Sequence, residues 1–386
     1  MRPTVEQVKS PIAAGDYFLM GDEAAADGAI VAGCNFFAGY PITPASELME
    51  RMVYRLKEFG GAFIQMEDEI GSISAMIGAS WAGAKAMTAT SGPGFSLMME
   101  GIGYAALTET PLVIVDIQRA GPATGQATRP GSGDVMQVKF GSHGDYEIIA
   151  LSPWSAQEMF DLTVAAFNYA EGYRVPVFVM ADESVGHLHE KVTMPEVIER
   201  WRRPSKPGAE PFDTDDADGV PPMPAFGQGE KLLVTGSTHN GRGFRKTQDS
   251  GVHSKLVKRI VHKIRNASEE ISRYKTYFTD DVEMLFVAYG FSARATLEVV
   301  RDFRRRGVKA GLFRPVTLWP FPEQALREIA ANARHVIVPE MNWGQMSREV
   351  ERVLHRDIVC IPQVNGEGMQ PETIVTCLKE KAILEL

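Results

Sequence analysis

The first 200 residues alternate between two hydrophobic patterns. Short apolar runs are typical of buried strands, and longer segments with apolar residues every three or four positions are typical of helices. The runs predict strands at 35–38, 62–65, 86–90, 112–116, 147–150 and 177–181. The longer segments predict helices such as 44–57, 72–83 and 156–171. This alternation predicts a mostly parallel sheet with helices on both faces.

The pattern changes after residue 202. Residues 203–229 combine six prolines with several Asp and Gly residues, as in a linker or a long surface excursion. A second alternation follows, with strands predicted at 232–235, 284–288, 309–312 and 336–339 and helices at 254–272, 293–306, 322–332 and 344–355. We therefore expect an α/β protein with a doubly wound sheet domain at 1–202, a linker at 203–229 and a smaller α/β domain at 230–386.

Composition narrows the classes of function. The chain has 386 residues and a net charge of −9 without a basic run, which argues against binding to nucleic acid or to an anionic membrane. No apolar stretch reaches transmembrane length, and the first 17 residues lack the apolar core of a signal peptide, so we expect a cytoplasmic protein. The three cysteines are too scattered for a disulfide framework, a zinc site or an iron–sulfur cluster.

The loop at 39–47, with the sequence GYPITPASE, follows a predicted strand and precedes a predicted helix. Pro41 and Pro44 stiffen it and leave the Thr43 hydroxyl available between them. Rigid loops at this position hold small-molecule sites in α/β proteins. The alternative is a well-formed helix start with proline near its first turn.

The segment at 65–72, QMEDEIGS, also joins a strand to a helix. Its three carboxylates could simply stabilise the positive end of that helix. The helix, however, carries Gly71, Ser74, Ala75, Gly78, Ala79 and Ala82 on one face. A face of such small residues permits close approach of another backbone or of a flat ligand. Glu67, Asp68 and Glu69 therefore lie at the start of a helix that a partner protein or a ligand could contact.

Two further segments leave predicted strands. Residues 88–96, TATSGPGFS, could let a ligand approach the glycine backbone, and Phe95 could offer a ring for stacking, although most Gly-Pro-Gly turns are only turns. In 116–125, DIQRAGPATG, Arg119 is predicted to face the crevice beyond the strand ends, where its guanidinium could bind a carboxylate. A structural ion pair with Asp116 or Asp134 is an equal alternative.

Together these four segments resemble the α subunit of 2-oxoacid:ferredoxin oxidoreductases. Their order and spacing match, and the resemblance extends over nearly the whole chain. It implies a thiamine diphosphate pyrimidine-binding domain followed by a domain similar to the C-terminal domain of transketolases. The later segment at 140–145, FGSHGD, looks most like the 2-oxoglutarate branch of the family.

The resemblance also implies roles for individual residues. Glu69 matches the family glutamate at the aminopyrimidine ring, where a carboxyl group favours the tautomer that activates the cofactor. Burial would raise its pKa and suit it to proton exchange near neutrality. Thr43 and Arg119 match residues near the substrate oxygens and the substrate carboxylate. Pro41, Ile42 and Phe95 are the further predicted cofactor contacts.

The choice of substrate is less constrained. A 2-oxoglutarate site needs a second cation or donor set for the distal carboxylate, and Arg129, Lys139 and His143 are the candidates in this chain. Pyruvate or a branched-chain 2-oxo acid remains an alternative substrate. A transketolase-type enzyme without an iron–sulfur relay and a non-catalytic assembly subunit are alternatives of other classes. Isolated histidines such as His187 are expected to be structural.

The resemblance predicts partners because half of the cofactor site is missing. The Gly-Asp-Gly signature, which binds the diphosphate through a metal ion in this family, is absent from the sequence. The cysteine-rich motifs that hold iron–sulfur clusters are absent as well. We therefore expect no metal ligands from this chain. We expect a β subunit that holds the diphosphate, Mg²⁺ and at least one [4Fe–4S] cluster, an (αβ)₂ assembly, and use of ferredoxin and coenzyme A.

Overall fold

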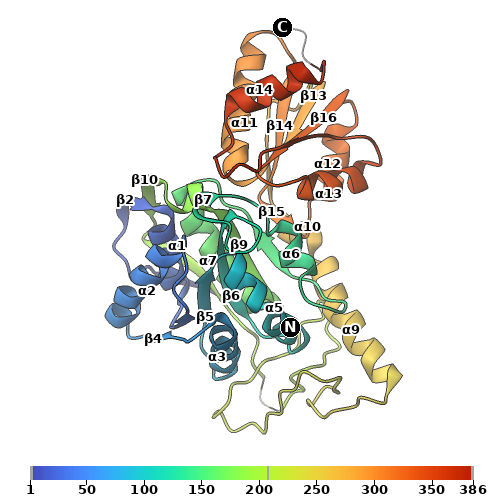
Figure 1. Ribbon diagram of the computed structural model, residues 1–386. Coiled ribbons are helices and arrows are strands. Elements are labelled where there is room, and N and C mark those ends of the chain that lie inside the picture. Colours follow the sequence, from blue (N-terminus) through green and yellow to red (C-terminus); the bar gives the residue numbers. More distant parts are fainter. Residues whose placement is uncertain (1–2, 207, 384–386) are drawn as a thin grey trace.

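The computed structural model describes residues 3–206 and 208–383. Residues 1, 2, 207 and 384–386, which include one position of the predicted linker, lie outside the described residues. The chain forms two α/β units, one above the other in Figure 1. The lower unit holds the N-terminal sheet, and the upper unit, coloured orange to red, holds the C-terminal sheet.

The N-terminal unit is built on an eight-stranded sheet in the order β15-β8-β9-β6-β5-β3-β4, with β7 paired to β6. Its central strands are all parallel, and only β15 and β7 run antiparallel to their neighbours. The strands are β3 (Phe36–Gly39), β4 (Ala62–Gln65), β5 (Ala86–Thr90), β6 (Leu112–Ala120), β7 (Gln126–Pro130), β8 (Ile149–Leu151), β9 (Pro176–Asp182) and β15 (Thr317–Trp319). The prediction of a doubly wound parallel sheet is confirmed.

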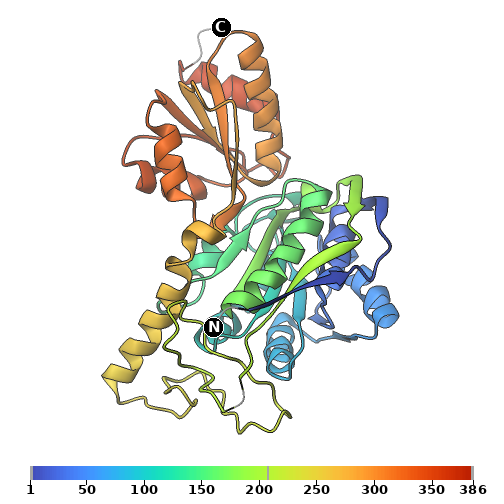
Figure 2. The ribbon, with the colours of Figure 1, turned by 180° about the vertical axis from the view of Figure 1, so that it is seen from behind.

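Helices cover both faces of this sheet because its strands are apolar on both sides. In β6, Val113, Val115 and Ile117 pack into the core beneath α1, α2 and α7, whereas Leu112 and Ile114 pack into the core beneath α3, α4 and α5. Figure 2 shows α7 lying across the first of these faces. The helices are α1 (Gly21–Ala32), α2 (Ser46–Phe59), α3 (Glu69–Trp81), α4 (Gly92–Leu97), α5 (Met99–Leu107), α6 (Val135–Phe140), α7 (Ala156–Tyr173) and α8 (Glu183–Gly186).

Two small ribbons flank the N-terminal sheet. They pair β1 (Thr4–Lys9) with β11 (Val197–Arg202) and β2 (Gly15–Met20) with β10 (His189–Met194), both antiparallel. Each ribbon joins the beginning of the chain to the end of the predicted first domain. None of these four strands was among those that we predicted.

The C-terminal unit has a five-stranded sheet in the order β12-β14-β13-β16-β17, parallel except for β12. Helices α11 and α14 cover one face, and α12 and α13 cover the other. The strands are β12 (Tyr274–Tyr277), β13 (Met284–Val287), β14 (Ala310–Pro315), β16 (His335–Glu340) and β17 (Val359–Pro362). The helices are α11 (Gly290–Arg305), α12 (Glu323–Ala330), α13 (Gln345–Leu354) and α14 (Pro371–Glu380).

Two of the sequence predictions for this half are wrong. Residues 232–235 form no strand, because Leu232 and Val234 pack on Trp81 and its neighbours without any adjacent strand to bond their backbone. The alternating apolar residues that predicted a strand therefore belong to a segment that packs on the N-terminal unit without joining a sheet. The helix expected at 254–272 is two helices, α9 (Ser250–Arg265) and α10 (Ser268–Ile271).

The described residues between 203 and 249 are irregular, but they are anchored to the N-terminal unit. Arg174, fully buried, donates hydrogen bonds to the carbonyls of Pro211, Pro221 and Pro222 at 2.7–3.1 Å. The buried carboxylate of Glu109 accepts hydrogen bonds from Arg259 and Lys263 on α9. The excursion and α9 therefore lie against the N-terminal unit, along its lower side in Figures 1 and 2.

Three connections join the two units. Strand β15 comes from the C-terminal half of the chain and extends the first sheet beside β8. Arg314 of β14 is fully buried, pairs with Glu158 of α7, and lies 4.0 Å from the ring centroid of Trp154. A single apolar core also continues from α5 into α12 and α13. The residue boundaries of the domains stay a prediction. No helix in the described ranges has the length and hydropathy to span a membrane.

Candidate functional site

A crevice of about 440 Å³ lies between the two units. Loops that follow β5, β6, β16 and β17 line it, so the carboxyl ends of parallel strands in both sheets face this space. Open α/β sheets hold their ligands at this edge. The lining residues from the first unit include Gly92, Pro93, Arg119 and Asp134, and those from the second include Asn342, Trp343 and Gln363.

Glu69 is the first residue of α3, directly after the capping residue Asp68, whose side chain accepts a hydrogen bond from the Gly71 amide at 2.7 Å. The Glu69 side chain is buried, with 4% of the residue exposed. Its carboxyl group lies against Gly94 of α4, where a β-carbon would come within 2.6 Å of Glu69 Cδ. Burial raises the pKa of Glu69, and the negative charge of Asp68 raises it further. The site therefore holds a carboxyl group whose pKa lies above the usual value for glutamate.

Arg119 and Thr43 meet at the same edge of the sheet. Arg119 is the last residue but one of β6, and its Nη1 donates a hydrogen bond of 2.8 Å to the Thr43 carbonyl. Arg119 is buried, its Nε has no partner within the described residues, and the residue lines the crevice. The guanidinium thus braces the 39–47 loop and still has donors for an anion in the crevice.

A pair of carboxyl groups lies beside Arg119. Asp116 is fully buried, and this burial, together with the neighbouring Asp134, holds the pKa of Asp116 well above its usual range. The pKa of Asp134 is raised to about 6 by burial, against the lowering effects of Asp116 and Arg119. The raised pKa values favour a proton on one of the two groups. Arg119 acts on Asp134 through its charge, and within the described residues it forms no direct ion pair with either carboxyl group, unlike the alternative that we considered from the sequence.

The three predicted cofactor contacts besides Glu69 have different surroundings. Pro41 is exposed, and Ile42 is half-buried against the core below α1. Phe95 is fully buried and packs edge-to-face on Phe178, with ring centroids 5.7 Å apart. Its ring therefore has no free face for stacking in this chain, because the turn of α4 directs it into the core. The cofactor roles of these residues remain predictions.

The three predicted cations for a distal carboxylate do not lie together. Arg129 of β7 is half-exposed and pairs with Glu367 at 3.3 Å, beside the crevice residues Pro130 and Gly366. The His143 side chain is 86% exposed and lies 3.7 Å from Glu100. Lys139 pairs with Glu147 and donates to the Tyr146 carbonyl, away from the crevice. Among the three, Arg129 is therefore the one at the rim.

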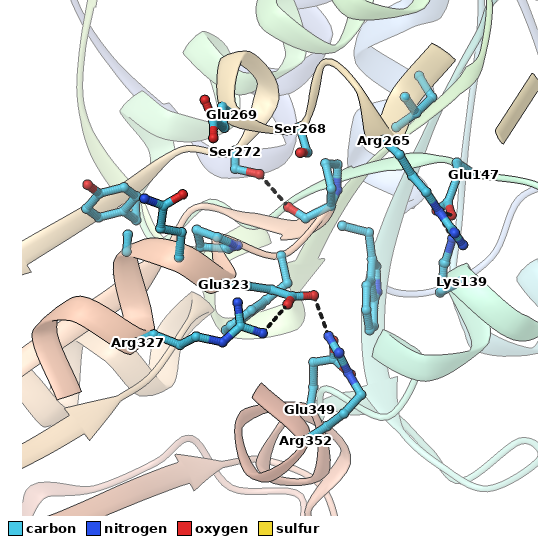
Figure 3. A pocket seen from close by; sticks show the side chains of 18 of the residues that line it. Lys139, Glu147, Arg265, Ser268, Glu269, Ser272, Glu323, Arg327, Glu349 and Arg352 are labelled. Atoms are coloured by element: carbon cyan, nitrogen blue, oxygen red, sulfur yellow. Dashed lines mark hydrogen bonds and ion pairs between the residues drawn. The ribbon is translucent and has the colours of Figure 1, made fainter. Parts of the chain in front are cut away.

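Lys139 lines a larger cavity of about 920 Å³, which shares no lining residue with the crevice. Figure 3 shows that its charged side chains face one another: Glu147 binds Lys139 and Arg265, and Glu323 binds Arg327 and Arg352. Charges that are already paired contribute little to binding an anion, so the crevice is the better candidate site.

The sequence did not reveal how the second unit completes the crevice. Asn342 is buried and donates to the Ser132 carbonyl at 2.7 Å, and the Ser132 amide donates to the Met341 carbonyl. Glu340, fully buried, anchors the same loop by accepting from the Met346 and Ser347 amides. Residues 341–344 directly follow β16, and from sequence alone such a segment is most simply a surface turn. Only the packing of the two sheets reveals their place beside the crevice.

Two family profiles match the chain. The profile described as "pyruvate flavodoxin/ferredoxin oxidoreductase, thiamine diP-bdg" matches residues 27–259, and the profile described as "pyruvate:ferredoxin oxidoreductase core domain II" matches residues 282–374. The chain belongs to the pyruvate flavodoxin/ferredoxin oxidoreductase family. The predicted resemblance to 2-oxoacid:ferredoxin oxidoreductase α subunits is confirmed, and so is the prediction of a thiamine diphosphate-binding domain followed by a second domain.

Curated relatives within this oxidoreductase family favour one branch. The chain is 51% identical to the 2-oxoglutarate synthase subunit KorA of Methanocaldococcus jannaschii, over 95% of this chain and 99% of the relative. It is 36% identical to the ketoisovalerate oxidoreductase subunit VorB of Methanothermobacter thermautotrophicus, over 94% and 97% of the two chains. The higher identity supports our prediction of the 2-oxoglutarate branch.

Solved structures agree with this assignment. The chain superposes with a TM-score of 0.90 and 31% identity on the 2-oxoglutarate:ferredoxin oxidoreductase from Magnetococcus marinus, solved with 2-oxoglutarate, coenzyme A and succinyl-CoA bound. The match covers 95% of this chain and 65% of that chain. A split-gene transketolase matches with a TM-score of 0.57 at 14% identity, which shows a shared fold only.

Proposed function

We propose that this chain is the α subunit of a thiamine diphosphate-dependent 2-oxoglutarate:ferredoxin oxidoreductase. The enzyme interconverts 2-oxoglutarate and coenzyme A with succinyl-CoA and CO₂, with ferredoxin as electron carrier. The observation that carries the proposal is the identity of about half to 2-oxoglutarate synthase subunits along nearly their full length. The placement of Glu69, Thr43 and Arg119 at one edge of the sheet supports it.

The residues at this edge suit the cofactor. A buried carboxyl group with a raised pKa, as Glu69 has, can share a proton with a ring nitrogen of the aminopyrimidine. Thiamine diphosphate, when bound, supplies the carbon nucleophile and takes up the electrons that decarboxylation releases. Glu69 then holds and returns a proton at its carboxyl oxygen. Pro41 and Ile42 would flank the cofactor from the 39–47 loop.

Arg119 and Thr43 would bind the substrate. Arg119 lines the crevice, so its guanidinium would pair with the 1-carboxylate, and the Thr43 hydroxyl would bind a substrate oxygen. The bond from Arg119 to the Thr43 carbonyl fixes both groups relative to one another. Asp134 adjusts the local charge, since its pKa of about 6 leaves it largely ionised at neutral pH.

The distal carboxylate of 2-oxoglutarate needs a further cation. We favour Arg129, because it lies at the rim of the crevice on the strand that pairs with the Arg119 strand. Lys139 and His143 are the other predicted candidates. Arg129→Met should raise the KM for 2-oxoglutarate at least tenfold and leave the KM for pyruvate unchanged, whereas His143→Ala is the matched test of the alternative. Equal effects of Arg129→Met on both substrates would contradict the assignment.

A partner chain completes the proposal. The relatives are named as subunits, and we propose a β chain that holds the diphosphate, Mg²⁺ and [4Fe–4S], in an (αβ)₂ assembly with coenzyme A as acceptor. The exposed small-residue face of α3, with Ser74 and Gly78 open to solvent and Ile70 53% exposed, is the surface where it would dock beside Glu69. Ser74→Arg should abolish co-purification of the partner. A cytoplasmic location remains part of the same proposal.

The decisive experiment measures reduction of methyl viologen by the chain purified with its native partner chains. We expect activity that requires 2-oxoglutarate, coenzyme A and thiamine diphosphate together, with kcat/KM for 2-oxoglutarate at least tenfold above that for pyruvate and 3-methyl-2-oxobutanoate. Glu69→Gln should remove nearly all turnover while the complex stays assembled. Turnover of a branched-chain acid in preference to 2-oxoglutarate would overturn the choice of substrate.

A further inference from the structure

A second cluster of titratable side chains lies at the start of α1, separate from the crevice. It contains Asp22 in the first turn of α1, Glu47 in the first turn of α2 and His187 directly after α8. One possible ligand atom from each of the three lies within 4.8 Å of the others. Three elements that are distant in the sequence thus bring two carboxylates and an imidazole to one point.

Asp22 is the unusual member of the cluster. It is fully buried, and within the described residues neither of its carboxylate oxygens has a hydrogen-bond partner. The Leu48 backbone amide interacts with this carboxyl group more weakly than His187 does. A buried carboxyl group without a well-formed hydrogen bond is costly. Its position is explained if a cation completes its surroundings.

His187 is oriented as a metal ligand would be. Its Nδ1 lies 3.3 Å from Glu183 Oε1, while its Nε2 lies 3.5 Å from Glu47 Oε2 and 3.2 Å from the Pro44 carbonyl oxygen. Metal-binding histidines commonly donate their second ring nitrogen to a carboxylate in this way. Both ring nitrogens thus face oxygen acceptors.

The balance of charge favours an additional cation. Asp22, Glu47 and Glu183 face one imidazole, and Arg51, one turn beyond Glu47, is instead paired with Glu23 and Asp27. Gly186 leaves the backbone close to the carboxylate, since a β-carbon there would lie 2.7 Å from Asp22 Oδ1. The cluster therefore has three carboxyl groups around one imidazole, and their side-chain atoms are already close together.

We propose that Asp22, Glu47 and His187 bind a divalent transition-metal cation, with the Pro44 carbonyl as a neighbouring oxygen donor. Two carboxylates, a carbonyl and one imidazole form a mainly oxygen donor set with one nitrogen, which suits Mn²⁺ better than the softer copper ions. The cation joins α1, α2 and α8 to the loop that carries Thr43. It would replace the proton on His187. This site differs from our expectation of no metal ligands in this chain.

The test counts manganese in the complex of this chain with its native partners, loaded with MnCl₂ and desalted. Elemental analysis should find one Mn²⁺ fewer per copy of this chain in Asp22→Asn than in wild type. Mn²⁺ taken up by the partner's diphosphate site cancels in this difference. Glu183→Gln should lower the Mn²⁺ affinity about 10–100-fold by releasing the orientation of His187. Glu50→Gln, exposed on α2, is the matched control and should keep the wild-type count.

The location is checked by anomalous diffraction at the manganese edge, where a peak between Asp22, Glu47 and His187 is expected. If Asp22→Asn does not fold, Glu47→Gln removes a ligand from a side chain that is 42% exposed and should give the same loss. Equal manganese counts in wild type and variant, or a density map without that peak, would overturn the proposal. Because neither readout uses turnover, the result is independent of the proposed enzyme activity.

Discussion

Gly94 sets the position of the Glu69 carboxyl group, and Gly94→Ala tests this directly. A β-carbon at residue 94 would lie 2.6 Å from Glu69 Cδ and still closer to the carboxylate and to the Thr90 hydroxyl. Carbon atoms in ordinary contact are about 3.5 Å apart or more, so the carboxyl group must retreat by about 1 Å. A misplacement of about 1 Å at a catalytic group can cost about 100-fold in rate.

The same change should leave the protein folded. Overpacking by one methyl group costs about 1–3 kcal/mol, and replacing glycine by alanine in a helix recovers about 0.5–1 kcal/mol. The net loss is small beside the usual total of about 5–15 kcal/mol. Gly94→Ala should therefore lower kcat much more than it lowers the free energy of unfolding.

The assay is 2-oxoglutarate-dependent reduction of methyl viologen by the complex, with thermal unfolding measured on the same samples. Gly251→Ala, in the exposed first turn of α9, is the matched control and should keep wild-type kcat. The double variant with Glu69→Gln should be hardly slower than Glu69→Gln alone, because both changes act on one group. A folded Gly94→Ala complex with more than half of the wild-type kcat would refute the reasoning.

Three further predictions concern buried charges. Arg314→Met should lower the free energy of unfolding by up to about 3–5 kcal/mol, because the buried Glu158 loses its main partner and keeps only the half-exposed Lys275 at 3.2 Å as a charged partner among the described residues. Denaturant unfolding measures this, and Arg301→Gln, at an exposed position of α11, should change it by less than about 0.5 kcal/mol. The pKa of Asp116 is higher in the folded than in the unfolded protein, so the contribution of Asp116 to stability falls as the pH rises from about 4. Asp116→Asn should therefore reduce the slope of the unfolding free energy against pH between pH 5 and 7, by up to about 1.4 kcal/mol per pH unit. Parallel profiles for wild type and variant would contradict this. Arg259 joins the 203–249 excursion to the N-terminal unit, because it donates hydrogen bonds both to Glu109 and to the Phe212 carbonyl. Arg259→Gln should therefore speed limited proteolysis within the excursion, and unchanged cleavage would contradict this role of Arg259.

Much of the fold followed from local patterns. The strands 86–90 and 112–116 were predicted within a few residues, because a strand buried on both faces must be apolar at successive positions. The prediction failed at 232–235, where alternating side chains pack on Trp81 without a neighbouring strand. A hydrophobic pattern predicts which side chains are buried. A strand needs in addition a neighbouring strand, from elsewhere in the chain, to form hydrogen bonds with its backbone.

The site divides in the same way. Motifs and local patterns were enough to predict the family, the two α/β units and the segments that carry Thr43, Glu69 and Arg119, since each segment lies at the end of a strand whose pattern is local. The packing of distant segments was needed to show that β15 joins the first sheet, that Phe95 points into the core, and that residues 341–343 line the crevice. It also brought Asp22, Glu47 and His187 together. Such contacts join distant segments through packing, and no local pattern of residues specifies which distant segment will be the neighbour.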